Sequence, residues 1–149
     1  MLSKLLARSV FAFTGWTFNN QMPKDLKQCV MIAAPHTSNW DALYTRPAFV
    51  LMGIPVKITI KDSYMRFPYG PVIRYLGGIG IDRSPKKEGE ERPSMVQLMA
   101  DLFKKYDDLV MLITPEATRS LRTQWKTGFY HIAVAANVPI ALGYCDYKK

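Results

Sequence analysis

The sequence predicts a single layered α/β domain, in which helices flank a largely parallel mixed sheet. Along the chain, short apolar runs alternate with segments of helical spacing, the pattern of parallel strands joined by crossover helices. The length of 149 residues suits one compact domain. Hydrophobic residues make up 48% and charged residues 21% of the chain, which excludes a disordered protein.

The first half of the chain is expected to supply three strands. The continuous apolar run QCVMIAA predicts a buried strand over residues 28–34. Alternating β-branched residues predict a second strand over 54–60, and the glycine-rich GGIGID predicts a third, weakly specified strand over 77–82. The helices expected between them cover 38–52, where Pro47 should start a new turn or kink the helix, and 63–76, with a break at 68–71.

The second half is expected to supply two more strands and two helices. The polar run RSPKKEGEER predicts a solvated loop over 83–92. Apolar residues at helical spacing predict a helix over 94–106 with one core-facing stripe. The most apolar strand is expected over 109–114, followed by a helix over 123–136 and a last strand over 138–144.

The amino-terminal segment differs in character from the domain expected over 25–149. Residues 1–24 mix aliphatic and aromatic side chains with Lys4 and Arg8, and no acidic residue precedes Asp25. This composition is typical of an amphipathic helix that lies on anionic headgroups; the alternative is an ordinary first helix packed on the domain. No stretch of the chain reaches the roughly 20 apolar residues that a transmembrane helix needs.

The net charge of +8 points to an anionic partner, either nucleic acid, an acidic membrane surface or a phosphorylated substrate. Cys29 and Cys145 are the only cysteines, which excludes a disulfide framework and favours a reducing cytoplasm. The only histidines, His36 and His131, leave no Cys/His cluster that could hold zinc. His131 lies in an apolar helical run and is expected to be a core histidine.

Reactive residues follow several expected strands, and parallel strands bring their carboxyl ends to one edge of the sheet. His36 directly follows the first strand, and Asp41 follows five residues later. On one continuous helix this spacing would keep the two side chains apart. With His36 in the loop and Ser38 capping the helix, Asp41 falls in the first turn and can reach the imidazole, as in a catalytic dyad. The alternative is that Asp41 only caps the helix and His36 makes a loop hydrogen bond.

Two other strand ends carry arginines suited to phosphate. Arg83 follows the third strand, and Glu116 and Arg119 follow the fourth. A guanidinium donates a planar pair of hydrogen bonds to phosphate, although Glu116 and Arg119 could instead form a local salt bridge. The chain lacks G-x-S-x-G, Walker A and Rossmann patterns, and Cys29 has only apolar or amide neighbours. The nucleophile is therefore expected to come from a substrate.

Four motifs resemble those of glycerophospholipid acyltransferases of the lysophosphatidate (1-acylglycerol-3-phosphate) acyltransferase type. HTSNWD is similar to the H-x-x-x-x-D motif of that family, GGIGIDRS to its second motif, PEATRS to its E-G-T-R-S motif and VPIALGY to its apolar-Pro motif. The four occur in the family's order from His36 to Tyr144. They resemble the small bacterial branch most, and the implied fold is glycerol-phosphate acyltransferase-like.

The resemblance implies an O-acyltransferase of phospholipid biosynthesis. It would move a fatty acyl group from acyl-CoA or acyl-acyl carrier protein to a hydroxyl of a lysophospholipid or glycerol phosphate. His36 would be the general base and Asp41 would orient it, whereas Arg83, Glu116 and Arg119 would bind the acceptor. No metal or bound cofactor is implied, because the thioester is a cosubstrate. The protein would be a peripheral protein on the cytoplasmic face of the cell membrane.

Three departures from the family pattern bear on the site. Ala117 replaces the usual glycine of the third motif, which is expected to restrict a tight turn beside the phosphate. Gly80 stands where this branch often has proline. The sequence ends at Lys149, where relatives continue with further strands and helices, so we expect a shortened carboxyl terminus and an incomplete acyl pocket.

The sequence leaves one rival function open and gives little support to a second. A shortened relative could bind a lipid surface without catalysing acyl transfer, in which case it would bind vesicles and consume no thioester. Nucleic-acid binding is motivated by charge alone and lacks any RNA-binding or helix-turn-helix signature, so no nucleic-acid partner is expected.

Overall fold

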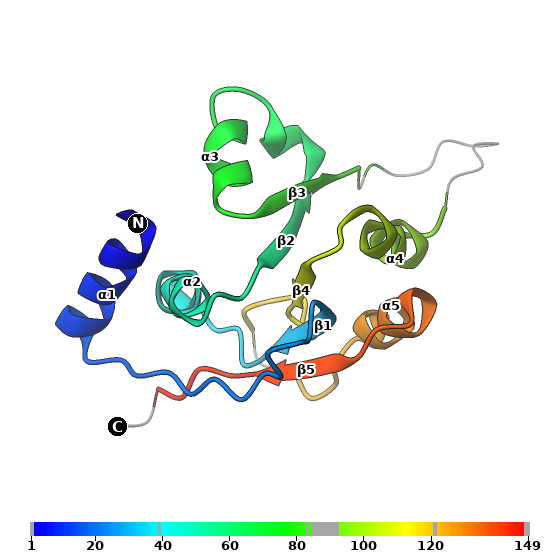
Figure 1. Cartoon of the computed structure of the whole chain (residues 1–149). Helices are drawn as coiled ribbons and strands as arrows, with labels where there is room; N and C mark the ends of the chain where they lie inside the picture. Colours follow the sequence, from blue (N-terminus) through cyan, green and yellow to red (C-terminus); the bar gives the residue numbers. More distant parts are fainter. Residues whose placement is uncertain (1, 39, 83, 85–92, 121, 148–149) are drawn as a thin grey trace.

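The centre of the molecule is a parallel sheet. A computed structural model describes residues 2–38, 40–82, 84, 93–120 and 122–147, and within these ranges five strands form one sheet (Figure 1). The strands lie in the order β3-β2-β4-β1-β5, and every neighbouring pair is parallel. The predicted α/β class is confirmed. The strands are β1 (Gln28–Ala33), β2 (Val56–Lys61), β3 (Gly78–Ile81), β4 (Leu109–Ile113) and β5 (Ile140–Gly143).

Helices cover both faces of this sheet. In Figure 1, α1 and α2 lie on one side and α4 and α5 on the other, while a short helical unit packs beside β3. This is the layered arrangement that crossover connections between parallel strands require. The helices are α1 (Leu2–Thr14), α2 (Trp40–Met52), the 3-10 helix η1 (Asp62–Met65), α3 (Gly70–Tyr75), α4 (Met95–Lys105) and α5 (Gly128–Ala136).

The core has two parts, one on each face of the sheet. Side chains alternate between the faces along a strand, so the two central strands contribute to both parts. The part under α4 and α5 contains Val30, Leu109 and Met111, and the part under α2 contains Cys29, Met31 and Val110. Because β1 and β4 are buried on both faces, the loops that leave their carboxyl ends start from a rigid base.

Several observed boundaries differ from the expected ones. The break predicted within 63–76 is present, and it separates η1 from α3. Pro47 lies inside α2 and does not end it, so the helix predicted over 38–52 continues past this residue, and the predicted kink stays a prediction. The helix predicted over 123–136 begins only at Gly128, because the N–H of Lys126 donates to the carbonyl of Pro115 at 2.9 Å and holds the preceding segment as a loop. The predicted loop over 83–92 lies outside the described residues, apart from Ser84.

Side chains close both ends of α4. The hydroxyl of Ser94 accepts a hydrogen bond from the N–H of Gln97 at 3.1 Å, as an N-cap does. At the other end, the side-chain amide of Gln28 donates to the carbonyls of Phe103 and Tyr106, each at 2.7 Å. These carbonyls would otherwise lack intrahelical partners. The bonds from Gln28 therefore tie the start of β1 to the end of α4.

The helix α1 packs against α2 and also exposes an apolar surface. Ala7 is buried on the packed side, whereas Leu5, Leu6 and Phe13 are 63%, 59% and 91% exposed. Lys4 is exposed on the same helix. The packing on the domain that was posed as one alternative is therefore present, whereas an orientation on anionic headgroups stays a prediction. No helix in the described ranges is long and apolar enough to cross a bilayer.

Candidate active site

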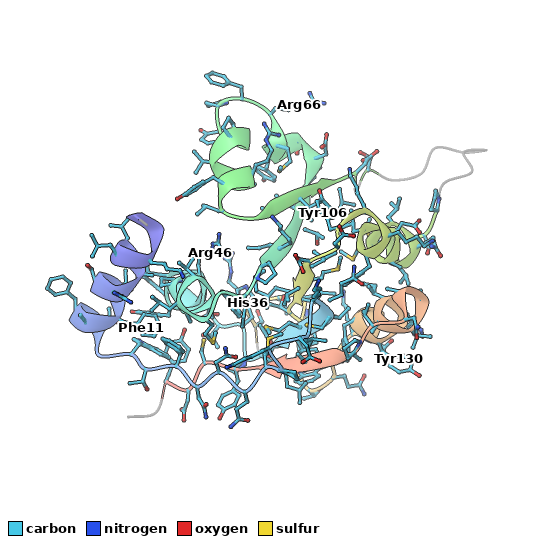
Figure 2. All side chains as sticks on the ribbon, in the orientation of Figure 1. Phe11, His36, Arg46, Arg66, Tyr106 and Tyr130 are labelled. Atoms are coloured by element: carbon cyan, nitrogen blue, oxygen red, sulfur yellow. The ribbon has the colours of Figure 1, made fainter. Side chains whose placement is uncertain are left out.

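Four of the five predicted site residues lie at the carboxyl edge of the sheet: His36, Asp41, Glu116 and Arg119. The loop after β1 carries His36, and the loop after β4 carries Glu116 and Arg119. Since β1 and β4 are neighbouring parallel strands, their two loops leave the sheet side by side. Figure 2 shows the His36 side chain beside α2, at this edge. Arg83, the other arginine expected here, lies outside the described residues.

His36 and Asp41 form a direct hydrogen bond. The Nδ1 atom of His36 lies 2.9 Å from Oδ2 of Asp41. His36 is in the loop, and Asp41 is in the first turn of α2, as the dyad interpretation required. The His36 side chain is 28% exposed and the Asp41 side chain 11% exposed. The imidazole is thus accessible to a substrate while its partner is almost covered.

The same carboxylate also caps the start of α2. Its Oδ2 accepts hydrogen bonds from the N–H groups of Thr37 at 2.9 Å and Ser38 at 3.2 Å. The hydroxyl of Ser38 in turn accepts from the N–H of Trp40 at 3.1 Å. The capping and dyad interpretations were posed as alternatives, but Asp41 makes both sets of contacts. The loop backbone therefore fixes the position of the oxygen that faces His36.

Asp41 is held in its charged form. Burial favours the neutral acid, but hydrogen bonds from Tyr147, Ser38, His36 and Thr37 outweigh burial and lower the pKa of Asp41 below its ordinary value of 3.8. An ionised carboxylate on Nδ1 keeps the proton on that nitrogen and leaves the lone pair on Nε2. Among the described residues, Nε2 of His36 has no hydrogen-bond partner. This arrangement can accept a proton from a bound hydroxyl.

Glu116 holds the His36 loop from the opposite side. Its Oε2 atom accepts a hydrogen bond from the backbone N–H of His36 at 2.8 Å, across 80 residues of sequence. Within the described part of the chain, Glu116 makes no salt bridge with Arg119, so the local ion pair considered for these two residues is absent. The contact joins the loop after β4 to the loop after β1.

An open pocket lies directly against His36. It has a volume of about 410 Å³ and is lined by His36, Thr114, Ala117, Thr118, Arg119 and Ser120. Ala117 adopts a φ of 53°, a left-handed conformation that glycine adopts without strain. The turn that the family's glycine would favour is thus formed here by alanine. Arg119 is exposed and has no ion-pair partner in the described ranges.

The remaining candidate groups lie away from this chemistry. The expectation that His131 is a core residue is wrong, because its side chain is exposed. Its ring lies against that of Tyr130, with the two ring centroids 5.5 Å apart. The next two residues, Ile132 and Ala133, face the core, and a rotation of about 100° per residue turns His131 outward.

Burial raises the pKa of the Cys29 thiol to about 11, which makes it a poor nucleophile. In the described ranges, no three His, Cys, Asp or Glu side chains group to hold a metal.

Asp41 has a further partner that was not predicted from the sequence. The hydroxyl of Tyr147 donates a hydrogen bond to Oδ1 of Asp41, the oxygen that faces away from His36. The two residues are 106 positions apart, and Tyr147 belongs to the segment after β5. The run CDYKK contains no motif or periodicity that indicates this contact.

Comparison with known proteins supports a family assignment. Residues 16–141, most of the chain, match the family described as Acyltransferase. The fold is similar to that of the crystal structure of 1-acyl-sn-glycerophosphate (LPA) acyltransferase, PlsC, from Thermotoga maritima, with a TM-score of 0.58 and 20% sequence identity. The match covers 93% of this chain and 54% of the other, so the chain spans about half the length of that protein. No curated protein matches the chain.

Proposed function

The chain belongs to the Acyltransferase family, and from this premise we propose that it moves a fatty acyl group from a thioester donor to an alcohol. The donor is acyl-CoA or acyl-acyl carrier protein, and the acceptor is a lysophospholipid or glycerol phosphate hydroxyl. The observation that carries the proposal is the hydrogen bond between His36 and Asp41, next to a pocket that also contains Arg119. The resemblance of the four motifs to lysophosphatidate acyltransferases supports this choice of acceptor.

The proposed reaction uses His36 as general base. Nε2 takes the proton of the acceptor hydroxyl while the hydroxyl oxygen attacks the thioester carbonyl carbon. The new C–O bond forms first, and the C–S bond then breaks as the tetrahedral intermediate collapses. The leaving thiolate takes the proton back from the imidazolium, so the enzyme returns to its starting state. Asp41 stabilises the imidazolium between the two proton transfers, because its carboxylate lies 2.9 Å from Nδ1.

The proposed acceptor site is the pocket beside His36. Arg119 lines it with an exposed guanidinium, which suits a phosphate because it offers a planar pair of donors. Thr118 and Ser120 add hydroxyl groups to the same wall. Glu116 supports the site through the backbone of His36. By family resemblance, Arg83 is proposed as a second ligand of the acceptor.

The proposed place of action is the cytoplasmic face of a membrane, as a peripheral protein. Leu5, Leu6 and Phe13 expose apolar surface on α1, and Lys4 and Arg8 are exposed elsewhere on the same helix. Apolar burial combined with attraction to anionic headgroups is the binding mode of an interfacial helix. We expect co-sedimentation with anionic vesicles that weakens as salt is raised, and loss of binding in a Leu5→Ser, Leu6→Ser, Phe13→Ser variant.

The test of the proposed activity is acyl transfer by the purified protein. Acyl-CoA or acyl-acyl carrier protein is mixed with lysophosphatidate, and the released thiol and the diacyl product are both quantified. Monoacylglycerol, which lacks the phosphate, serves as the matched acceptor. We expect equal amounts of thiol and product, with a preference for the phosphorylated acceptor that falls in Arg119→Ala. Vesicle binding with no thiol release from any acceptor would instead establish the non-catalytic lipid-binding alternative.

A further inference from the structure

Asp41 is held by a second partner on the side away from His36. Its Oδ2 faces the imidazole and the loop N–H groups, whereas its Oδ1 accepts the hydroxyl proton of Tyr147. The two oxygens therefore have different partners from different parts of the chain. A carboxylate bound through both oxygens cannot rotate about its terminal bond without breaking one set of bonds.

Aromatic contacts hold the Tyr147 ring in place. Trp16 stacks on Tyr44 of α2 with ring centroids 4.8 Å apart and an interplanar angle of 22°. The Tyr147 ring meets Trp16 edge-on at 5.1 Å and Tyr44 at 6.5 Å. Three segments that are distant in sequence thus converge on one tyrosine: the segment after α1, the helix α2 and the segment after β5. Edge-to-face packing of this kind restricts the ring even though Tyr147 is 46% exposed.

From this geometry we propose that Tyr147 is a positioning residue of the acyltransferase reaction. By holding Oδ1, its hydroxyl keeps the Asp41 carboxylate in the plane in which Oδ2 meets Nδ1 of His36. Within the described residues, Tyr147 makes no hydrogen bond or ring contact with His36 and does not line the pocket, so its effect on the reaction passes through Asp41. The inference rests on the proposed function of His36 and Asp41, but the hydrogen bond can be tested without any substrate.

The ionisation states of the pair suit this role. Burial and the neighbouring Asp41 carboxylate both raise the pKa of Tyr147 above its ordinary value of 10, so the phenol stays a neutral donor across the pH range of enzymes. The other groups that face the pair are His36 on Asp41, and Cys145 and Tyr44 on Tyr147. Burial and Asp41 also raise the pKa of Cys145, so this thiol stays neutral and adds no competing charge.

The test compares Tyr147→Phe with Tyr130→Phe. The first variant removes only the hydroxyl and keeps the ring that packs against Trp16 and Tyr44. The second removes the hydroxyl of an exposed tyrosine on α5, labelled in Figure 2, which serves as the matched control. Each variant is assayed for kcat and KM by thiol release. The carboxyl carbons of 13C-labelled aspartate are titrated by NMR, and the Asp41 resonance is identified by its loss in Asp41→Asn.

In Tyr147→Phe we expect the pKa of Asp41 to rise, kcat to fall on the order of 10-fold and KM to stay unchanged. A loss of this size is typical when a residue that positions a catalytic group, without touching the substrate itself, is replaced. Tyr130→Phe should match the wild type in both measurements. An unchanged Asp41 titration, or a kcat equal to that of the control, would overturn the proposal. If the wild type shows no acyl transfer, the proposed function fails, and the titration alone still decides whether the hydrogen bond controls Asp41.

Discussion

Replacing Asp41 by asparagine removes the charge beside His36 and little else. Asparagine has nearly the same shape, and its amide oxygen can still accept the hydrogen bonds that Thr37 and Ser38 donate to Oδ2. In the wild type the hydroxyl of Tyr147 donates to Oδ1 of Asp41, and in the variant the amide nitrogen can instead donate to that hydroxyl oxygen. The helix cap should therefore survive, while the imidazolium formed during the reaction loses its counter-ion.

The expected loss follows from the distance between the two groups. A full charge on the imidazole lies 2.9 Å from the carboxylate oxygen. The His36 side chain is 28% exposed, so we take an effective dielectric constant of about 40, which gives an attraction of about 3 kcal/mol. Since about 1.4 kcal/mol corresponds to a tenfold change in rate, kcat should fall about 100-fold. The loss should appear in kcat, because the charged imidazolium exists only after proton transfer.

The assay is thiol release from acyl-CoA in the presence of lysophosphatidate, with Asp101→Asn as control. Asp101 is an exposed aspartate on α4 that pairs with Lys104, so its replacement makes the same chemical change at the surface. Urea unfolding shows whether each variant is folded under the assay conditions. An Asp41→Asn enzyme that is folded and retains the rate of the Asp101→Asn control would refute the role of this carboxylate.

Three further predictions concern stability. Ala117→Gly should raise the free energy of unfolding by about 0.5–1 kcal/mol, because the strain of an alanine at φ 53° exceeds the extra chain entropy that a glycine loses on folding. A lower urea midpoint for this variant would contradict the prediction. Gly70→Ala should lower that free energy by about 2 kcal/mol or more, because a Cβ at this position would overlap the carbonyl oxygen of Met65. Gly128→Ala should be tolerated, because there is open space around the position of its Cβ. Because the fold lowers the pKa of Asp41, ionised Asp41 stabilises the folded protein above pH 3.8, and this stabilisation disappears as the pH falls through the pKa of the folded state. Urea titrations from about pH 5 to about pH 3 should therefore show a steeper decrease in the free energy of unfolding for the wild type than for Asp41→Asn. Equal slopes for the two proteins would show that Asp41 is not held in its charged form by the fold.

Local sequence patterns predict most of the fold and the centre of the site. Apolar runs mark the central strands β1 and β4, because buried parallel strands need side chains of that kind on both faces. The contact between His36 and Asp41 also follows from local spacing, since a loop, a capping serine and the first helical turn bring the two together. In each case the residues concerned lie close together in sequence, so the local geometry of the helix or strand determines their relative positions.

Other features depend on tertiary contacts that no local pattern reports. Tyr147 reaches Asp41 across 106 residues, and Glu116 reaches the backbone of His36 across 80. The start of α5 is delayed by a bond from Lys126 to Pro115, although the preceding sequence favours helix by its spacing. His131 is exposed because the buried side of α5 is narrow, which an almost uniformly apolar helix does not reveal.

The central claim is that His36 is the base of an acyl transfer, and the two histidines of the chain provide its most direct test. Thiol release and acylated product are measured for His36→Ala and for His131→Ala, which replaces the exposed histidine on α5. The account predicts that His36→Ala loses about 10²–10⁴ in kcat while remaining folded, and that His131→Ala transfers acyl groups at the wild-type rate. Equal rates for His36→Ala and the wild type would contradict it.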